Sequence, residues 1–479
     1  MLFNSIEFAL FFPLVCCLYF AVPIRARVGL LLVASCVFYM VFIPAYIFIL
    51  FLTIGIDYTA GIFIEKSHGH RRRVWLIGSI ISTCAVLFVF KYFNFFTASF
   101  TSIAQLLGWH IPENHWNIIL PIGLSFHTFQ SLSYVVEVYR RKQEAEYNFI
   151  NYATYVMFFP QLVAGPIERP QNLLHQFCEV HPFDYDRVTS GLKRMAWGFF
   201  KKLVVADRLA LYVNDVYSAP RNHNGLQLTL GTFFFAYQIY CDFSGYSDIA
   251  IGTARVLGFR LIENFSTPYH SLSVSEFWRR WHISLSTWFK DYVYVPLGGS
   301  RVTTARWIFN VMVTFALSGL WHGANWTYVL WGFLNGFYLV FGQLTKRFRN
   351  SFFGLISWTE ETLIRKALML LSTFALTCGA WVLFRARNLG DALYIFRNFF
   401  IGWDFHQVRT QQFFLRQLPV AILAIVLLEC CELIGRRIPV ERVAVNLPGV
   451  FRWAGYTVFI FGIILFGVFR REQFIYFQF

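Results

Sequence analysis

The chain has 479 residues, of which 57% are hydrophobic and only 14% are charged, whereas soluble domains carry about 25% charged residues. Apolar runs of about 18 residues recur along it, each long enough to cross a bilayer core of about 30 Å. The composition excludes an ordinary soluble protein and predicts an all-α, multi-pass protein in contact with the lipid bilayer. The net charge of +15 lies in short clusters between the apolar runs, which argues against a nucleic-acid partner.

The first third of the chain predicts an orderly series of membrane spans. They lie near residues 6–23, 28–43, 45–64, 74–99 and 117–138. Basic residues between them occur at 25–27, 66–73 and 140–142. Because cytoplasmic loops are enriched in Lys and Arg, one orientation places all three clusters in the cytoplasm. That orientation puts the N-terminus on the outer face of the membrane.

The middle of the chain, residues 148–300, has shorter apolar runs that Gly, Pro and charged residues interrupt. The interruptions include Pro160, Gly165, Asp242, Gly245 and Asp248. Irregular or charged backbone at membrane depth is tolerated only where it is buried in protein or lines a watery cavity. We therefore expect broken helices here that form the working part of the protein. The alternative is that some of these runs are surface loops.

The last third regains clean spans near 367–384, 418–434 and 453–469. More arginines precede the final span than follow it, which favours a C-terminus on the outer face. The whole chain, 1–479, is predicted to form one membrane domain of roughly 11–13 embedded helices. Its parts are N-terminal helices (1–147), a core with broken and amphipathic helices (148–345), and C-terminal helices with a tail (346–479).

A single histidine, His322, lies between the apolar runs 307–321 and 327–341. Ionisable side chains inside hydrocarbon cost about 2.5–3.5 kcal/mol when fully charged, so such a residue is a functional candidate. A neutral imidazole costs less, and a hydrogen-bonded packing histidine is the alternative. Two glycines and two tryptophans flank His322 in the segment 318–326.

A tryptophan-rich segment at 273–292 predicts an amphipathic helix. Ser273 and Glu276 fit a capping box, which marks a helix start, and an apolar stripe follows at helical spacing. The polar side carries Arg279, Arg280 and Lys290. These cations suit a phosphate-bearing ligand, although a plain interfacial helix has the same pattern. A second histidine, His282, lies one position off the stripe.

Two carboxylates, Asp242 and Asp248, lie in an apolar context. Each could orient a histidine or pair with Arg255 or Arg260 for structure alone. Neither His282 nor His322 has further ligands at the spacing that zinc needs, and no Gly-x-Ser-x-Gly elbow occurs. We therefore expect no metal and no bound cofactor, and the chemistry that remains is a histidine acting as general base on a hydroxyl.

Three motifs give the chain a resemblance to a known family. They are FSGYSD at 243–248, EFWRRWHISLSTW at 276–288 and LWHGAN at 320–325. Together with MLFNS at the start, PIGLSF at 121–126, AGP at 164–166 and FIYFQF at the end, they resemble the membrane-bound O-acyltransferases. Within that family the similarity is to the membrane subunits of bacterial alginate-type O-acetyltransferases.

The resemblance implies a ring of helices around a thinned centre with a transmembrane tunnel, in the bacterial inner membrane. The family's catalytic histidine falls on His322 and its second characteristic histidine on His282, with Asn325 as a supporting polar residue. Acetyl-CoA would enter from the cytoplasm as the donor, and its acetyl group would reach an outer acceptor for O-acetylation of an exported or cell-wall polysaccharide.

The acceptor polymer is too large for such a tunnel, so the resemblance implies a relay to a periplasmic partner of the SGNH-hydrolase kind. Tyr476, near the outer C-terminus, could carry the acetyl group transiently, and the alternative is an aromatic anchor at the membrane interface. Two other functions stay open. One is a D-alanyl transferase for teichoic acids in the same fold, and the other is a transporter or export channel without chemistry.

Overall fold

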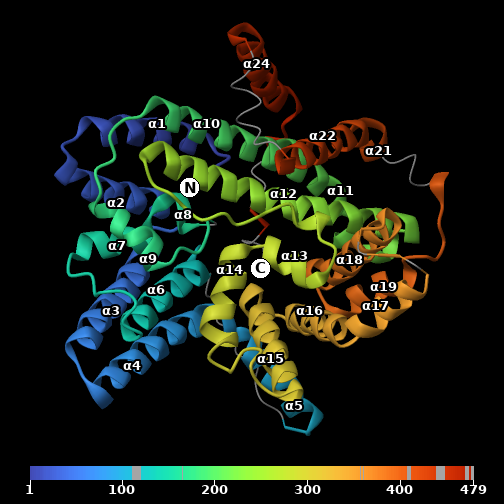
Figure 1. Ribbon diagram of the computed structural model, residues 1–479, viewed down its shortest axis with the longest axis horizontal. Helices are drawn as coiled ribbons and strands as arrows, with labels where there is room; N and C mark the ends of the chain where they lie inside the picture. Colours follow the sequence, from blue (N-terminus) through green and yellow to red (C-terminus); the bar gives the residue numbers. More distant parts are fainter. Residues whose placement is uncertain are drawn as a thin grey trace. The chain divides into compact units, whose positions relative to one another are not determined.

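The computed structural model describes residues 1–109, 120–163, 165–356, 358–359, 361–406, 412–437, 448–469 and 474–475, and Figure 1 shows its helices. This part of the chain contains helices and no β-strand, which confirms the all-α prediction. It divides into two compact units. The first unit comprises Met1–Met195 and Ile249–Ile262, and the second unit comprises Ala196–Asp248 and Glu263–Phe479.

The helices of the first unit follow the predicted spans closely. They are α1 (Ile6–Ala21), α2 (Ile24–Met40), α3 (Tyr46–Lys66), α4 (Gly69–Leu87), the π-helix η1 (Phe88–Tyr92), α5 (Phe93–Leu106), α6 (Leu124–Tyr139), α7 (Phe149–Met157), α8 (Phe159–Leu162), α9 (Pro170–Leu173), η2 (Leu174–Cys178) and the start of α10 (Tyr185–Phe199). Asp57 on α3 is buried and accepts hydrogen bonds from Ser79 (2.6 Å) and Thr83 (3.0 Å) on α4. A buried carboxylate is thereby satisfied between two apolar helices.

Except for residues 249–257 at the end of α12, which belong to the first unit, the second unit contains the end of α10 and the remaining elements. They are η3 (Phe200–Ala206), α11 (Asp207–Ser218), η4 (Pro220–Asn222), α12 (Gly225–Leu257), η5 (Pro268–His270), α13 (Val274–Arg280), α14 (Ile283–Phe289), η6 (Lys290–Tyr294), α15 (Thr304–His322), α16 (Trp326–Leu344), α17 (Lys346–Leu355), α18 (Leu363–Arg385), α19 (Leu389–Asn398), α21 (Gln412–Arg416), α22 (Leu418–Arg437) and α24 (Gly449–Phe466). The predicted spans in the last third are confirmed as α18, α22 and α24.

The predicted interruptions around Pro160 and Gly165 are confirmed, since only the short helices α8 and α9 follow α7 there. The long helix α12 corrects the other part of the prediction, the expected breaks at Asp242, Gly245 and Asp248. It runs for 33 residues through Asp242, Gly245 and Asp248 without interruption. The two carboxylates do not break it, because each faces a lysine within the second unit, as described below. A Cβ atom on Gly245 would lie 2.8 Å from the carbonyl oxygen of Gly198, so this glycine allows α10 to pack closely against α12. Small residues serve the same purpose in other membrane helix pairs.

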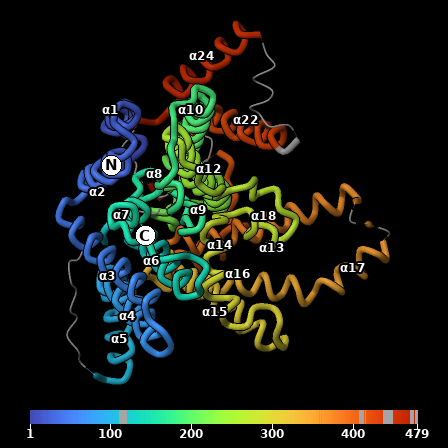
Figure 2. The backbone as a smooth tube through the Cα atoms, turned by 60° about the vertical axis from the view of Figure 1, so that its left-hand side comes forward, coloured from blue at the N-terminus to red at the C-terminus, as the bar shows by residue number. Residues whose placement is uncertain are grey.

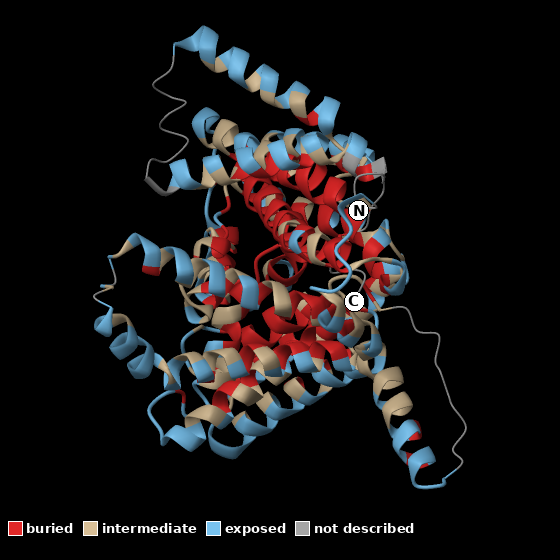
Figure 3. Cartoon of the chain, turned by 90° about the vertical axis from the view of Figure 1, so that its right-hand side faces the viewer, coloured by how far each residue is buried: buried red, intermediate tan, exposed pale blue. Residues whose placement is uncertain are grey.

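Five described helices are long and apolar enough to cross a membrane. They cover Tyr46–Lys66, Gly69–Leu106, Leu363–Arg385, Leu418–Gly435 and Gly449–Phe466, and Ile6–Ala21 is a shorter apolar helix. On α24 only Ile463 is buried, and this helix is mostly pale blue at the top of Figure 3. Apolar side chains that no protein covers suit contact with lipid. The chain is therefore a multi-pass membrane protein.

Helices α15 and α16 form a tight hairpin in the second unit, and Figure 2 shows them side by side in yellow. They confirm the predicted runs 307–321 and 327–341 as two helices that end and begin at the His322 segment. At their crossing a Cβ atom on Gly319 would lie 2.3 Å from the carbonyl oxygen of Tyr328. Only glycine permits this approach, which fixes the last turn of α15.

Candidate active site

His322 is the last residue of α15 and is 4% exposed. Its ring lies 4.9 Å from the ring of Trp331 on α16, nearly edge to face, and 5.3 Å from that of Phe384 on α18. A helix C-terminus stabilises nearby positive charge by about 0.3–1 kcal/mol, and aromatic faces attract cations. Burial disfavours the imidazolium that forms when a general base takes a proton, and the helix end and the aromatic rings around His322 offset part of this cost.

A cluster of large aromatic rings surrounds this position. Trp331 stacks on Trp381 at 6.0 Å, Trp381 lies 5.0 Å from Trp281, and Trp278 lies 5.7 Å from Trp331. These rings come from α13, α16 and α18 and the short link after α13. Their bulk excludes water from the histidine, and electrostatic interactions are stronger in a dry site.

The predicted amphipathic helix at 273–292 starts where expected but is not continuous. Ser273 caps α13 by accepting the Glu276 N–H at 3.2 Å. The helix stops at Arg280, and α14 begins at Ile283. Between them His282 adopts a left-handed backbone with φ of 44°. Such a conformation costs energy in a non-glycine residue and persists only where its surroundings hold it.

Asn264 holds the broken segment in place. Its backbone oxygen accepts the Ile283 N–H at 2.9 Å, and its side-chain oxygen accepts the Ser284 N–H at 3.3 Å. The same Oδ1 atom lies 3.2 Å from Nδ1 of His282. A backbone N–H can only donate, so the Asn264 atom that it meets must be the oxygen. His282 Nδ1 must then carry a proton, and in the neutral ring Nε2 bears the lone pair.

His282 is fully buried and lies outside the five candidate spans. Burial lowers the pKa of His282 to about 3, because the imidazolium form loses its hydration. Its ring lies 4.5 Å from Phe243 on α12 and 6.2 Å from Trp321, which in turn lies 4.9 Å from His322. Both predicted histidines therefore contact the same indole ring.

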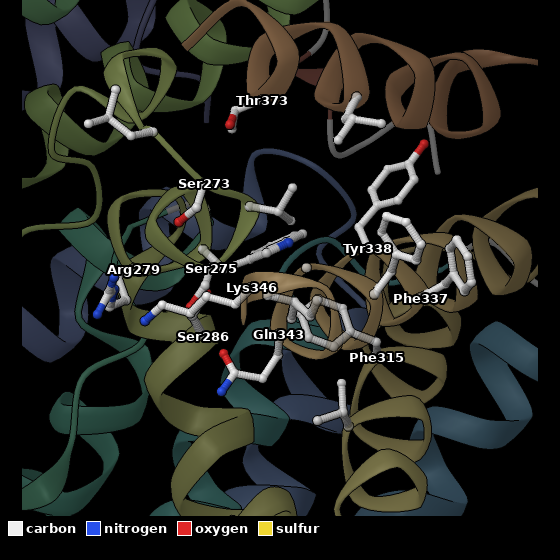
Figure 4. A pocket seen from close by; sticks show the side chains of 18 of the residues that line it. Ser273, Ser275, Arg279, Ser286, Phe315, Phe337, Tyr338, Gln343, Lys346 and Thr373 are labelled. Atoms are coloured by element: carbon white, nitrogen blue, oxygen red, sulfur yellow. The ribbon is translucent and has the colours of Figure 1, made fainter. Parts of the chain in front are cut away.

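A cavity of about 1360 Å³ opens within the second unit beside this aromatic cluster. Figure 4 shows Ser273, Ser275 and Arg279 on one side of it and Phe337 and Tyr338 on another. Five cationic side chains line it, and the described lining residues include no carboxylate. The cations are Arg279, Lys290, Lys346, Arg349 and Arg365. The cavity suits a ligand with several negative charges and an apolar part.

The cavity reaches the surroundings of His322 through two of its lining residues. Trp278 contacts Trp331, which contacts His322. Ser318 lines the cavity one helical turn before His322 on α15. The cavity wall and the histidine therefore share α15, and a contact between two tryptophans links them.

The three predicted phosphate contacts have different positions. Arg279 and Lys290 line the cavity. Arg280 does not, because it pairs with Glu276 at 2.5 Å and donates to Thr267 at 3.3 Å. Arg280 therefore stabilises the turn before His282. Lys346 on α17 also lines the cavity, and no sequence motif marks it.

Asp242 and Asp248 face lysines on the π-helix η3. Asp242 pairs with Lys202 at 2.7 Å, and Asp248 pairs with Lys201 at 2.9 Å. These two lysines are consecutive on η3, and both reach carboxylates on α12. The predicted alternatives for these carboxylates named arginine partners, and the lysines were missed because no sequence pattern marks a π-bulge.

Asn325 caps α16, since its side-chain oxygen accepts the Thr327 N–H at 3.0 Å and its amide donates to the Arg387 carbonyl oxygen at 3.2 Å. Its placement is therefore that of a helix cap. Tyr476, the possible acyl carrier, lies outside the described residues. Among the residues that the structure describes, no three His, Cys, Asp or Glu side chains gather to hold a metal ion.

Comparison with known proteins identifies the family. Residues 75–384 match the model of the membrane-bound O-acyltransferase family. The chain is 37% identical over 433 residues to a protein of Azotobacter vinelandii named "Probable alginate O-acetylase AlgI". This alignment covers 89% of this chain and 84% of the relative. It is 32% identical over 399 residues to the peptidoglycan O-acetyltransferase of Helicobacter pylori, in an alignment that covers 77% of this chain and 72% of the relative. It is 24% identical over 320 residues to the teichoic acid D-alanyltransferase of Bacillus subtilis, with 65% of this chain and 77% of the relative covered.

The buried histidine at the end of α15, the basic cavity beside it and these similarities agree. The chain is an acyltransferase and belongs to the membrane-bound O-acyltransferase family.

Proposed function

We propose that this chain is an O-acetyltransferase of the bacterial inner membrane that takes acetyl from cytoplasmic acetyl-CoA. It moves the acetyl group across the membrane for O-acetylation of an exported, alginate-type polysaccharide. The observation that carries the proposal is the cavity lined by five cations whose wall adjoins His322. The identity to the alginate O-acetylase of Azotobacter vinelandii supports the acetyl group and the polymer.

The donor fits the chemistry of the cavity. Coenzyme A carries a diphosphate and a further phosphate, and Lys and Arg bind phosphates by charge-assisted hydrogen bonds. Arg279 and Lys290 would bind these phosphates, and Lys346 adds a third cation. The apolar part of the wall suits the uncharged pantetheine arm, and Trp278 in this wall contacts Trp331 beside His322.

His322 acts as the general base in this proposal. It takes the proton from the acceptor hydroxyl as the hydroxyl oxygen attacks the thioester carbonyl. The carbon–sulfur bond breaks, and the proton passes to the sulfur of coenzyme A. General base catalysis contributes about 10²–10⁴-fold, so positioning of the two substrates must supply much of the remaining rate. His282, held as the Nδ1–H tautomer by Asn264, presents Nε2 as a second acceptor in the site.

The route beyond the histidine follows from the family resemblance. A ring of helices around a thinned centre would form the tunnel, with both chain ends on the outer face. A periplasmic partner of the SGNH-hydrolase kind would complete transfer to the polymer. Tyr476 would carry the acetyl group in between, because a phenol of pKa about 10 leaves more easily than a sugar hydroxyl. Tyr476→Phe with undiminished polymer acetylation would remove this step.

Binding of radiolabelled acetyl-CoA to the purified protein tests the donor. The proposal expects saturable binding that unlabelled coenzyme A displaces and that added salt weakens. A D-alanyl transferase would instead take its acyl group from a carrier protein, and the Bacillus subtilis relative makes this the second candidate. Binding of an acylated carrier protein with no binding of acetyl-CoA would favour that candidate.

Export of unmodified polymer separates the enzyme from a transporter. Cells that carry His322→Ala should export the polymer without acetyl groups. Loss of export together with acetylation would favour a channel and contradict the proposed transfer role.

A further inference from the structure

The segment after α24 returns to the core of the second unit. Val468 donates its N–H to the carbonyl oxygen of Leu203 on η3 at 3.0 Å, and Arg208 donates to the carbonyl oxygen of Phe466. Further on, Phe474 is 0% exposed and Ile475 is 1% exposed. These two residues lie outside the described helices and are nevertheless buried, so specific contacts hold them in place.

A buried carboxylate supplies the first of these contacts. The Ile475 N–H donates to Oδ2 of Asp242 at 2.8 Å. Oδ1 of the same carboxylate pairs with Lys202 at 2.7 Å, and Lys202 also pairs with Asp207 at 2.8 Å. One ammonium thus serves two buried carboxylates, and the Ile475 N–H supplies a further donor to this acid-rich cluster. Hydrogen bonds to an ionised acceptor are stronger than neutral ones.

Aromatic packing supplies the second contact. The Phe474 ring lies 4.4 Å from that of Tyr246 and 5.7 Å from that of Phe243, both on α12. Phe243 in turn lies edge-on to His282 at 4.5 Å. Phe474 therefore packs against Phe243, the same ring that contacts the second histidine of the site.

We propose that Asp242 and Lys202 anchor the C-terminal tail in the catalytic unit, and that the anchored tail holds Phe243 against His282. The carboxylate fixes the backbone at Ile475, and Phe474 fills the space behind Phe243. Phe474 and Ile475 are thus part of the active-site wall. This role rests on the proposed function only in that His282 belongs to the working site.

A second ion pair on the same helix distinguishes the role of Asp242. Asp248 and Lys201 form a second buried ion pair on α12 and η3, at 2.9 Å. The C-terminal hydrogen bond goes to Asp242. Both carboxylates therefore stabilise the α12–η3 contact, whereas the described contact with the tail belongs to Asp242.

Carboxypeptidase trimming of the detergent-purified full-length protein, followed by intact mass spectrometry, tests the anchor. Wild-type protein should be trimmed only as far as Ile475. Asp242→Ala should allow trimming past Phe474 at least tenfold faster. Asp248→Ala is the matched control, because it also leaves a buried lysine without its carboxylate, and it should keep the wild-type stop.

Phe474→Ala is a second test variant, to be used if Asp242→Ala is not monodisperse on size-exclusion chromatography. It removes the ring packing without leaving a buried charge, and it too should be trimmed faster. Trimming of Phe474→Ala and any folded Asp242→Ala at the wild-type rate and position would overturn the anchor. Full activity of Tyr476→Phe would remove the carrier role and leave this trimming result unchanged, so the two failures are distinguishable.

Discussion

Asn264 determines the tautomer of His282. Its side-chain oxygen lies 3.2 Å from Nδ1 of the histidine and also accepts the Ser284 backbone N–H, which fixes the orientation of the amide. A partner that sets which imidazole nitrogen carries the proton also sets which nitrogen can accept one. The polar contact of this asparagine therefore prepares Nε2 of His282 as an acceptor inside an apolar site.

Asn264→Asp should shift the pH dependence of acetyl transfer. A carboxylate beside Nδ1 stabilises the imidazolium and raises the pKa of His282 from its lowered value near 3,. The neutral ring is then present only above the raised pKa, so the acid limb of the kcat/KM profile should move to higher pH. The measurement is the pH profile of transfer with purified protein.

Asn310→Asp is the control for that shift. Asn310 is equally buried in the second unit, and its amide donates to the Gly299 carbonyl oxygen at 3.1 Å. It tests whether any new buried carboxylate moves the profile. An unmoved acid limb in Asn264→Asp, or an equal shift in both variants, would contradict a specific role for the Asn264 contact.

The sequence predicted the elements of the fold better than the links between them. The apolar spans were predictable because each carries its own length and hydropathy, as α3, α18 and α22 illustrate. The helix break at His282 was not predictable, because the apolar stripe from Phe277 to Tyr292 has the spacing of a continuous helix. The break depends on Asn264, whose hydrogen bonds replace those of the helix and are not encoded in local periodicity.

The effect of the charged residues on helix continuity also depends on contacts from other segments. The sequence predicts interruptions at Asp242 and Asp248, yet α12 runs through both. Whether a charged residue breaks a helix depends on a partner from another segment, here Lys202 and Lys201. A motif could select His322 because its chemistry is local, whereas these partners required the fold.

Lys346→Ala should weaken donor binding without changing the chemical step. The lysine lines the cavity on α17, away from the aromatic cluster around His322. Loss of one phosphate contact of about 1.4 kcal/mol raises KM for acetyl-CoA about tenfold, and kcat should stay near the wild-type value. Steady-state kinetics at low and high salt measure both effects, and the difference between variants should shrink with salt.

Lys366→Ala is the matched control for the cavity lysine. Lys366 pairs with Glu361 at 2.5 Å and does not line the cavity. Its loss should leave KM for acetyl-CoA unchanged. Equal rises in KM for the two variants would indicate a general effect of net charge and argue against phosphate binding in the cavity.

Gly319→Ala should destabilise the α15–α16 hairpin. The new Cβ atom would lie 2.3 Å from the Tyr328 carbonyl oxygen, and overpacking of this kind costs about 1–3 kcal/mol. We expect a lower melting temperature in detergent and lower turnover, since α15 ends at His322. Gly462→Ala on α24 is the control, because nothing lies within 4 Å of its Cβ position; destabilisation by both variants alike would refute the steric explanation.

His322→Gln should abolish most of the transfer while leaving donor binding intact. Glutamine is similar in length and can form hydrogen bonds, but it cannot take a proton at neutral pH. Loss of a general base lowers kcat by about 10²–10⁴-fold, and the affinity for acetyl-CoA should stay within a few-fold because the cationic lining is untouched.

Stopped transfer assays and equilibrium binding on one preparation separate these effects. A variant that binds acetyl-CoA normally but transfers no acetyl group identifies His322 with the chemical step. A variant that binds poorly and melts early has instead lost the packing among Trp331, Phe384 and Trp321, which contact this ring. Turnover within a few-fold of wild type would exclude His322 as the base, and His282 would then be the remaining buried imidazole in the described site.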